Sequence, residues 1–373
     1  MRAFKVLLLA VALTATTAVS AADSLKVKFR SRALLDATAS GYGKDDVQGY
    51  FRLEDFRVGF KANYGKYELK ADMGLGGGKV AVKDLQLNYH FKNSVLSVGN
   101  GYEPFSMDML ISTADMRFNQ SASSVLAFTN SRKLGVTFHY YNDHCYLATG
   151  VYTNNDINHL GSDKKNSLVS TSRAVWRKRK GHNLLHVGGA FSFRTKDVNK
   201  DAPVGSLGSA GVTSMFGEDL LGAEIDHAGT ELKGLVEVLY TSRKMLLQGE
   251  YFYDRMNRTG GLEAYRAHGG YVQGSWLLAG EGFEYDAMYG IPGRPVSDKA
   301  IELVARFNYA NLNDGKSGIN GGVEKDLSLG VNFYLNKYIG FKLSGSYVWV
   351  GDHCGSFYDK DFFLAQARLQ YIF

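Results

Sequence analysis

The sequence predicts an all-β protein: a transmembrane antiparallel β-barrel of about 16 strands, with short periplasmic turns and long extracellular loops. Three observations support this prediction. Hydrophobic and polar residues alternate with a period of two along most of the chain, as in strands that face two different environments. The alternating segments are mostly about 9 to 12 residues long, enough for a tilted strand to cross a bilayer. The connections between these segments are alternately short and long.

The composition agrees with a barrel and excludes two other classes. The chain has 373 residues, including 43 Gly, 23 Tyr and 22 Phe but only 4 Pro, a balance that suits twisted sheets with aromatic rims. After the N-terminus, no apolar run approaches the roughly 18 residues that indicate a membrane-spanning helix. The aromatic content of 13% is too high for a disordered chain.

Residues 1–22 have the features of a secretory signal peptide. Arg2 and Lys5 give a positive start, an apolar stretch runs from Val6 to Leu13, and small residues follow at Val19 to Ala21. The alternative is an uncleaved anchor helix, but the apolar stretch is short. We therefore expect cleavage and export from the cytoplasm.

The remaining residues, 23–373, are expected to form a single outer-membrane barrel domain. Two of the 43 Lys and Arg lie in the signal segment, which leaves 41 basic against 37 acidic residues. The basic run from Arg177 to Lys180 is too short to indicate nucleic-acid binding. Cys145 and Cys354 are too few for a disulfide framework or a metal site, so we expect two free thiols.

The alternation begins directly after the signal segment. In residues 25–33 one face is apolar or small, and the other carries Lys26, Lys28, Arg30 and Arg32. A soluble sandwich would not bury four charges, so the charged face must contact water. In a membrane the apolar face would meet lipid and the charged face would line a lumen. Such strands must close on themselves, because hydrocarbon cannot satisfy an open sheet edge.

The same pattern continues to the C-terminus. The predicted strands are 24–37, 48–62, 66–73, 79–91, 94–101, 132–141, 144–153, 167–178, 183–195, 231–241, 244–255, 266–278, 299–311, 325–336, 339–350 and 361–373. An even number of strands returns both termini to the periplasm. A soluble all-β protein would share the period of two, but its polar face would point outward and its loops would be less unequal.

The connections and the aromatic residues support the same topology. Short turns occupy one end of the predicted barrel, and the other end receives the long segments 102–131, 154–166, 196–230 and 351–360. Segment 279–298 breaks this rule, because it is long yet falls on the side of the short turns. Tyr, Phe and Trp gather at strand ends, where they can form interfacial girdles.

Several segments carry a resemblance to a known family. They are Val82–Tyr89, Leu96–Asn100, Glu103–Phe105, Arg132–Val136, Gly270–Ser275 and Leu329–Asn336. In these the sequence resembles the phosphate-selective porin O and P family. The resemblance implies a sixteen-stranded homotrimeric porin constricted by inward-folded extracellular loops and one long periplasmic turn, which would account for 279–298. The sequence departs from the family at Met116-Arg117, where the family commonly has Glu-Arg.

We expect charges in the lumen, rather than catalytic residues, to carry the function. The candidate pore-lining, anion-binding residues are Lys26, Lys28, Arg30, Arg32, Arg57, Lys61, Lys83, Asp84, Arg117, Arg132, Lys133, Arg173 and Arg177. Most lie in one sector of the predicted wall, and a basic sector concentrates anions. The alternative for any single charge is pairing with a neighbouring strand.

The opposite sector of the lumen is expected to be acidic. Its predicted lumen-facing carboxylates are Glu237, Glu250, Asp254 and Glu302. Within the basic sector, Arg117 and the pair Arg132-Lys133 are expected to stand near the narrowest point of the pore. There they would face Lys83 and Asp84.

The sequence thus predicts a porin for passive diffusion of small hydrophilic anions across the outer membrane of a Gram-negative bacterium. The resemblance implies phosphate as the cargo and homotrimer formation, with outer-membrane lipid around the barrel. A general, weakly selective porin and a structural or adhesive barrel with a plugged lumen remain open. We expect no enzyme activity, cofactor, metal or nucleic-acid partner, since the histidines lack metal-ligand spacing and no nucleophile and base stand out.

Overall fold

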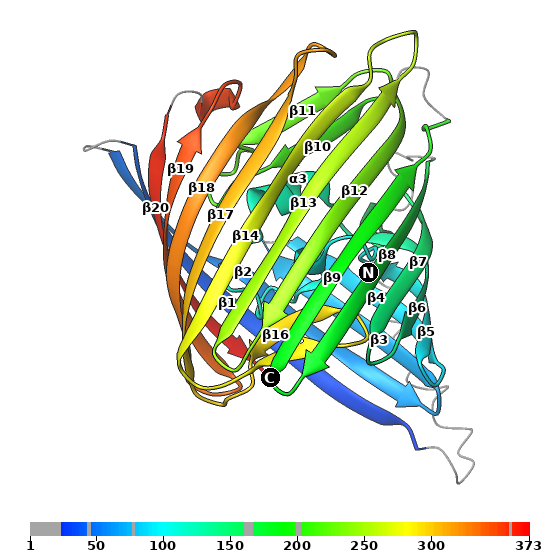
Figure 1. Cartoon of the computed structure of the whole chain (residues 1–373), viewed down its shortest axis with the longest axis vertical. Coiled ribbons are helices and arrows are strands. Elements are labelled where there is room, and N and C mark those ends of the chain that lie inside the picture. The colour runs from blue at the N-terminus through cyan, green and yellow to red at the C-terminus, as the bar shows by residue number, and fades with distance from the viewer. Residues whose placement is uncertain (1–23, 43–45, 77–78, 160–166, 199–202, 358–359) are drawn as a thin grey trace.

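A closed antiparallel barrel of sixteen strands forms the body of the molecule (Figure 1). The computed structural model describes residues 24–42, 46–76, 79–159, 167–198, 203–357 and 360–373. The predicted signal peptide, residues 1–22, lies outside this part of the chain, as do parts of the predicted loops. The fold class and the strand number predicted from the sequence are confirmed.

Each predicted strand corresponds to one strand of the barrel. In order around the wall these are β1 (Lys26–Tyr42), β2 (Asp46–Tyr64), β3 (Tyr67–Gly76), β4 (Lys79–His90), β5 (Ser94–Gly101), β6 (Lys133–Tyr141), β7 (Cys145–Thr153), β8 (Leu168–Lys180), β9 (Asn183–Arg194), β12 (Ala228–Thr241), β13 (Met245–Arg258), β14 (Tyr265–Ala279), β17 (Ala300–Asp314), β18 (Ile319–Tyr334), β19 (Ile339–Val350) and β20 (Phe362–Ile372). The barrel closes where β20 pairs with β1, with Leu35 opposite Leu369. In the described part of the chain, no helix is both long and apolar enough to span a membrane.

The connections divide the barrel into a turn end and a loop end. The turn end carries short connections such as residues 65–66 and 91–93, and the loop end carries the long segment 102–132. Cys145 lies at the turn end and Cys354 at the loop end, and both thiols are free. Segment 280–299 lies at the turn end despite its length, as the sequence predicts.

The outer face of the wall is apolar and the inner face is polar. Along β13, Leu247, Tyr251 and Tyr253 are exposed on the outside, whereas Glu250 and Asp254 are buried inside. This arrangement inverts that of a soluble protein and matches a barrel surrounded by lipid. Aromatic rings cluster at both ends, including Tyr67, Tyr89 and Phe91 at the turn end and Tyr347 with Trp349 at the loop end.

Further helices and strands lie in the connections between the barrel strands and are not part of the wall. They are α2 (Met107–Leu110), α3 (Ser123–Phe128), the hairpin of β10 (Gly205–Ser209) and β11 (Leu221–Ile225), the hairpin of β15 (Phe283–Asp286) and β16 (Ile291–Pro295), and the short helices η1 (Ile157–His159) and η2 (Gly355–Phe357). Figure 1 shows α3, β10 and β11 in the upper part of the barrel and β16 in its lower part. Phe128 of α3 stacks on Phe252 of β13 at 5.8 Å, and α3 also packs against β10, β14 and β17.

Candidate functional site

The carboxylates of the predicted acidic sector face inward, as expected, and two of them, Glu250 and Glu302, hold the folded-in segments rather than line open space. Glu250 accepts hydrogen bonds from the backbone N–H of Met107 at 2.7 Å and of Asp108 at 3.2 Å. The Ser106 hydroxyl donates to the same carboxylate at 3.0 Å. The first N–H groups of a helix have no partner within it, so Glu250 stabilises the start of α2 against β13.

Arg117 joins the same inward segment to β17 and to the hairpin from the turn end. Its Nε lies 3.2 Å from Glu302 Oε1, and its Nη2 donates to the Gly293 carbonyl at 2.8 Å. The guanidinium also lies 5.5 Å from the centre of the Phe283 ring. Arg117 is 2% exposed. Arg117 therefore lies on the acidic side of the lumen, and not beside Lys83 and Asp84 as expected.

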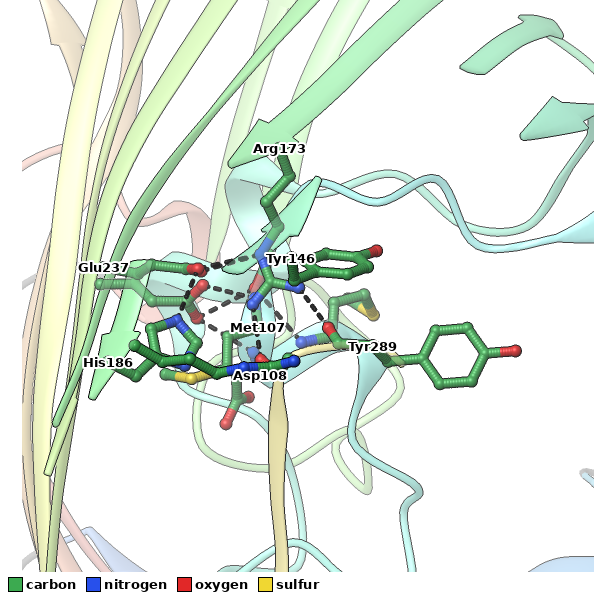
Figure 2. A network of polar contacts seen from close by, with 12 residues as sticks. Met107, Asp108, Tyr146, Arg173, His186, Glu237 and Tyr289 are labelled. Carbon is green, nitrogen blue, oxygen red and sulfur yellow. Dashed lines mark hydrogen bonds and ion pairs between the residues drawn. The ribbon is translucent and has the colours of Figure 1, made fainter. Parts of the chain in front are cut away.

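The tip of the β15–β16 hairpin crosses the lumen and is held by β8. Arg173 pairs with Glu237 at 2.9 Å and donates to the carbonyls of Tyr289 at 2.7 Å and Gly290 at 2.8 Å. Figure 2 shows Arg173 between Glu237 and the Tyr289 carbonyl, with His186 below the Glu237 carboxylate. Two of these contacts are to backbone carbonyls, so the arginine fixes the hairpin whatever side chains the tip carries.

Arg177, also on β8, makes a second set of contacts to the same hairpin. It donates to the carbonyl of Ala287 at 2.9 Å and to the hydroxyl of Tyr285 at 3.3 Å. Lys133 is likewise engaged, since its Nζ lies 3.3 Å from Glu103. These buried cations, together with Arg117 and Arg173, act as anchors for the inward segments.

A hollow of about 330 Å³ remains on the other side of the lumen. Strands β1 to β4 form one wall, and residues 109–116 of the inward segment, Tyr102 and Tyr289 form the other. Its lining contains six cations and three carboxylates: Arg30, Arg32, Arg57, Lys70, Arg132 and Arg294, with Asp72, Asp84 and Asp115. The open space thus lies against the basic sector of the barrel.

The carboxylates around this hollow are shared among more numerous cations. Asp55 pairs with Arg32 at 2.6 Å and with Arg57 at 3.2 Å. Asp84 pairs with Lys70 at 2.8 Å and Arg132 at 2.6 Å.

The remaining pairs of the hollow are one to one. Arg30 donates to Asp72 at 2.9 Å, and Arg294 lies 2.9 Å from Asp115. The Arg57 Nε, although buried, has no hydrogen-bond partner among the described residues. The hollow therefore retains an excess of positive charge and at least one free donor.

Twelve of the thirteen predicted site residues separate into three groups, and Lys83 stands apart. Five line the hollow, namely Arg30, Arg32, Arg57, Asp84 and Arg132. Arg117, Lys133, Arg173 and Arg177 anchor the inward segments. Lys26, Lys28 and Lys61 lie towards the turn end, with Lys28 directly opposite Lys61, which also lies 3.5 Å from Glu68. Lys83 precedes Asp84 on β4 but does not line the hollow.

Sequence reasoning missed four charged residues of the lining. Lys70 and Asp72 share the inner face of β3, and the alternation in 66–73 could have placed them there. Arg294 and Asp115 lie on the β15–β16 hairpin and on the inward segment. No periodicity in the sequence indicates where these segments fold, so these two residues were not predictable.

Two acids on the inward segment 102–131 have opposite pKa shifts. Burial by itself would raise the pKa of Glu103, but Lys133 and hydrogen bonds from Thr171 and Asn130 lower it below its usual range. For Asp108, burial dominates and raises the pKa. Glu103 is therefore held as a carboxylate, whereas the site of Asp108 favours the neutral acid.

Comparison with known sequences finds one matching family and one distant relative. Residues 18–373 match the model of the family described as phosphate-selective porin O and P. The chain is 26% identical over 300 residues to an uncharacterized protein of Caulobacter vibrioides, covering 76% of this chain and 58% of that protein. The chain thus spans less than two thirds of that relative's length.

Several solved outer-membrane barrels have a similar fold. OmpT, an outer membrane protein of Vibrio cholerae in its trimer form, is 13% identical with a TM-score of 0.62, over 94% of this chain and 100% of that one. The anion-selective porin from Comamonas acidovorans is 10% identical with a TM-score of 0.59, over 94% and 100%. The outer membrane channel DcaP of Acinetobacter baumannii is 11% identical with a TM-score of 0.58, over 95% and 99%. With the family match, these barrels confirm the predicted location in the Gram-negative outer membrane.

Proposed function

Since this chain belongs to the phosphate-selective porin O and P family and is an outer-membrane porin, we propose that it passes small hydrophilic anions by passive diffusion. One observation carries the proposal. The inward segments fill the acidic side of the lumen and leave a hollow whose lining has six cations and three carboxylates. A narrow aqueous space with excess positive charge raises the local concentration of anions and opposes cations.

The lining suits oxyanions such as phosphate, which the family description suggests as cargo. Four of the lining cations are arginines of the basic side, Arg30, Arg32 and Arg57 on the barrel wall and Arg132 just before β6. An arginine presents a planar fork of donors that matches two oxygens of a phosphate or carboxylate. The interleaved Asp55, Asp72 and Asp84 weaken each individual site, and conduction requires that an anion leave as readily as it enters.

Removing cations from the hollow tests the proposal. In the double variant Arg57→Gln with Arg132→Gln, every carboxylate keeps a partner, because Asp55 retains Arg32 and Asp84 retains Lys70. We expect the anion-to-cation permeability ratio to fall at least about threefold. The measurement is the reversal potential of single channels in a planar bilayer under a salt gradient.

The matched control changes two exposed lysines at the turn end. The variant Lys26→Gln with Lys28→Gln removes the same charge outside the hollow and should alter the ratio less. An equal effect of both double variants would indicate a general porin whose bias comes from overall charge. Absence of any conductance step in the unmodified protein would indicate a plugged barrel instead.

We further propose that the protein is a homotrimer that associates through the strands beside the barrel closure. A hollow of about 870 Å³ crosses the outside of β18, β19, β20, β1 and β2. Small residues form the base of this hollow, including Ala37, Ala39, Gly49, Gly345 and Ala367. Small side chains let two apolar walls approach closely in a membrane, where packing rather than the hydrophobic effect drives association.

We also propose that residues 1–22 are a signal peptide that is removed on export. The positive start, the short apolar stretch and the small residues before Ala22 support this. N-terminal sequencing of protein extracted from the outer membrane should begin within one or two residues of Ala22. A mature protein that still carries Met1 would indicate an uncleaved anchor.

A further inference from the structure

Among the residues that the structure describes, the outer face of the barrel carries three cations towards the loop end. The alternation of exposed and buried residues places Arg255 on the outside of β13, Arg266 on the outside of β14 and Lys325 on the outside of β18. From these residues to the turn end of the same strands, the outward positions hold no carboxylate; all of these positions are described. Charges on the lipid-facing side of a barrel are unfavourable, by about 2–4 kcal/mol for Arg or Lys at mid-membrane and about 0–1 near the interface.

Two of these cations stand directly beside each other. Arg255 and Arg266 are opposite one another in the register of β13 and β14, which puts their Cβ atoms roughly 5 Å apart. Like charges in this arrangement repel. In the described part of the chain neither guanidinium forms an ion pair, and the Arg266 side chain donates only to the Ala264 carbonyl at 3.2 Å.

None of the described acids at this rim forms an ion pair with either guanidinium, including the exposed Glu263 three residues before Arg266. Asp226 pairs with Arg258. Asp314 accepts hydrogen bonds from the backbone N–H of Arg266 at 2.9 Å and of Lys316 at 3.1 Å. The outward face of the pair formed by Arg255 and Arg266 is therefore open to an anion that does not come from this protein.

The surroundings fix the depth of this pair in the membrane. Tyr253 and His268 are the next outward residues towards the turn end and are opposite each other. The Tyr251 hydroxyl lies 3.0 Å from His268 Nδ1, and the Tyr309 ring lies 5.7 Å from the His268 ring. Below them the outward residues are apolar or glycine. Aromatic rings with polar tips lie at headgroup level, so the arginine pair faces the headgroups of the outer leaflet.

We propose that Arg255 and Arg266 form a binding site for a phosphorylated glycolipid of the outer leaflet, with the lipid phosphate between the two guanidinium groups. Two arginine forks can donate to the three free oxygens of a phosphomonoester, and the bound anion removes the repulsion between them. The acyl chains then lie along the apolar outer face of β13 and β14. This site concerns the outside of the barrel and does not depend on the anion preference of the pore.

Binding of purified lipid A tests the site. The detergent-solubilised protein is titrated with bisphosphorylated lipid A and with its dephosphorylated form, and bound lipid is counted by native mass spectrometry. We expect the protein to prefer the phosphorylated form, and Arg255→Gln with Arg266→Gln to bind it about tenfold more weakly. The control is Lys178→Gln with Lys180→Gln, which removes two outward cations at the turn end of β8 and should bind lipid A normally.

Three further measurements complete the test. Arg255→Lys with Arg266→Lys keeps the charge but loses the forks, and it should bind with intermediate affinity even if the glutamine variant folds poorly. Single-channel conductance of each variant should equal that of the unmodified protein, because neither residue faces the lumen. Excess inorganic phosphate should not displace lipid A. Equal binding of both lipid forms, or unchanged affinity in both arginine variants, would overturn the proposal.

Discussion

Glu103 shows how a single charge holds an inward loop in place. It lies two residues after the end of β5, is almost fully buried, and accepts hydrogen bonds from Thr171 and from Asn130. Lys133 at 3.3 Å supplies the opposite charge, and Lys233 lies further away. A buried carboxylate is tolerable only with such partners, because burial of an unpaired charge is costly.

This residue gives the pore a predicted sensitivity to acid. The pKa of Glu103 is lowered in the folded protein, so its ionised form contributes stability at neutral pH. That contribution is complete above the unfolded pKa of about 4.3 and is lost as the pH falls through the lower folded value. We expect the thermal midpoint of unfolding, measured from pH 7 to pH 3, to fall more steeply below about pH 4 in the unmodified protein than in Glu103→Gln.

Asp108 on the same segment supplies the opposite trend. Its pKa is raised, so its contribution favours the docked segment below its unfolded pKa and is lost as the pH rises through the higher folded value. The difference between the unmodified protein and Glu103→Gln isolates the effect of Glu103, since Asp108 is common to both. Parallel pH profiles for the two proteins would contradict the role given to Glu103.

Individual lining residues could be predicted only where the alternation of a strand fixes their direction. Arg30, Arg32 and Arg57 follow from the period of two, and all three line the hollow. Arg173 follows from the same rule and does face inward, yet its guanidinium is occupied by Glu237 and by two carbonyls. Periodicity gives the side of a strand on which a residue lies, but it does not reveal the segment that reaches the residue from across the lumen.

At the level of elements, the sequence predicts the strands well and the inward segments poorly. All sixteen barrel strands were predictable because each must present a largely apolar face to lipid over most of its length. The β15–β16 hairpin has no such constraint. Its path is determined by backbone carbonyls at Tyr289, Gly290 and Gly293 that accept from arginines of β8 and of the inward segment. Backbone carbonyls are present at every residue, so the sequence does not mark these positions.

Releasing this hairpin should both destabilise and widen the pore. In Arg173→Ala the hairpin tip loses two hydrogen bonds, and Glu237 is left buried with His186 as its remaining partner. Breaking a buried ion pair costs about 3–5 kcal/mol. We expect a loss of that size in the free energy of unfolding by urea and an increase in single-channel conductance.

The lysine variant serves as the matched comparison for Arg173. Arg173→Lys keeps the charge beside Glu237 but cannot donate to Glu237 and to both hairpin carbonyls in the same geometry, because it lacks the planar fork. We expect a smaller loss of stability and an intermediate conductance. Unchanged conductance in both variants would show that other contacts, such as those from Arg177, are sufficient to hold the hairpin.

Across the whole molecule, the small net charge conceals a strong separation of charge. The chain as a whole carries 43 basic and 37 acidic residues. Glu237 on β12 and Glu302 on β17 are paired with buried arginines and Glu250 on β13 accepts from the inward segment, whereas the cations on β1 to β4 remain around open space. The electrostatic preference of the pore therefore depends on which side of the barrel is filled, and the total charge is a poor guide to it.

The size of the side chains on the outer face of the barrel also differs from one side to the other. The hollow beside the barrel closure has small residues where β20 meets β1, whereas the outer face of β14 exposes larger side chains such as Val272. If copies of the chain associate through this hollow, Ala365→Trp should fill it and shift the protein from trimer to monomer in sedimentation velocity in detergent. The same substitution at Val272 should leave the trimer intact, because tryptophan is tolerated on a lipid-facing wall. A trimer that persists in the Ala365 variant, or dissociation in both variants, would place the contact on other strands.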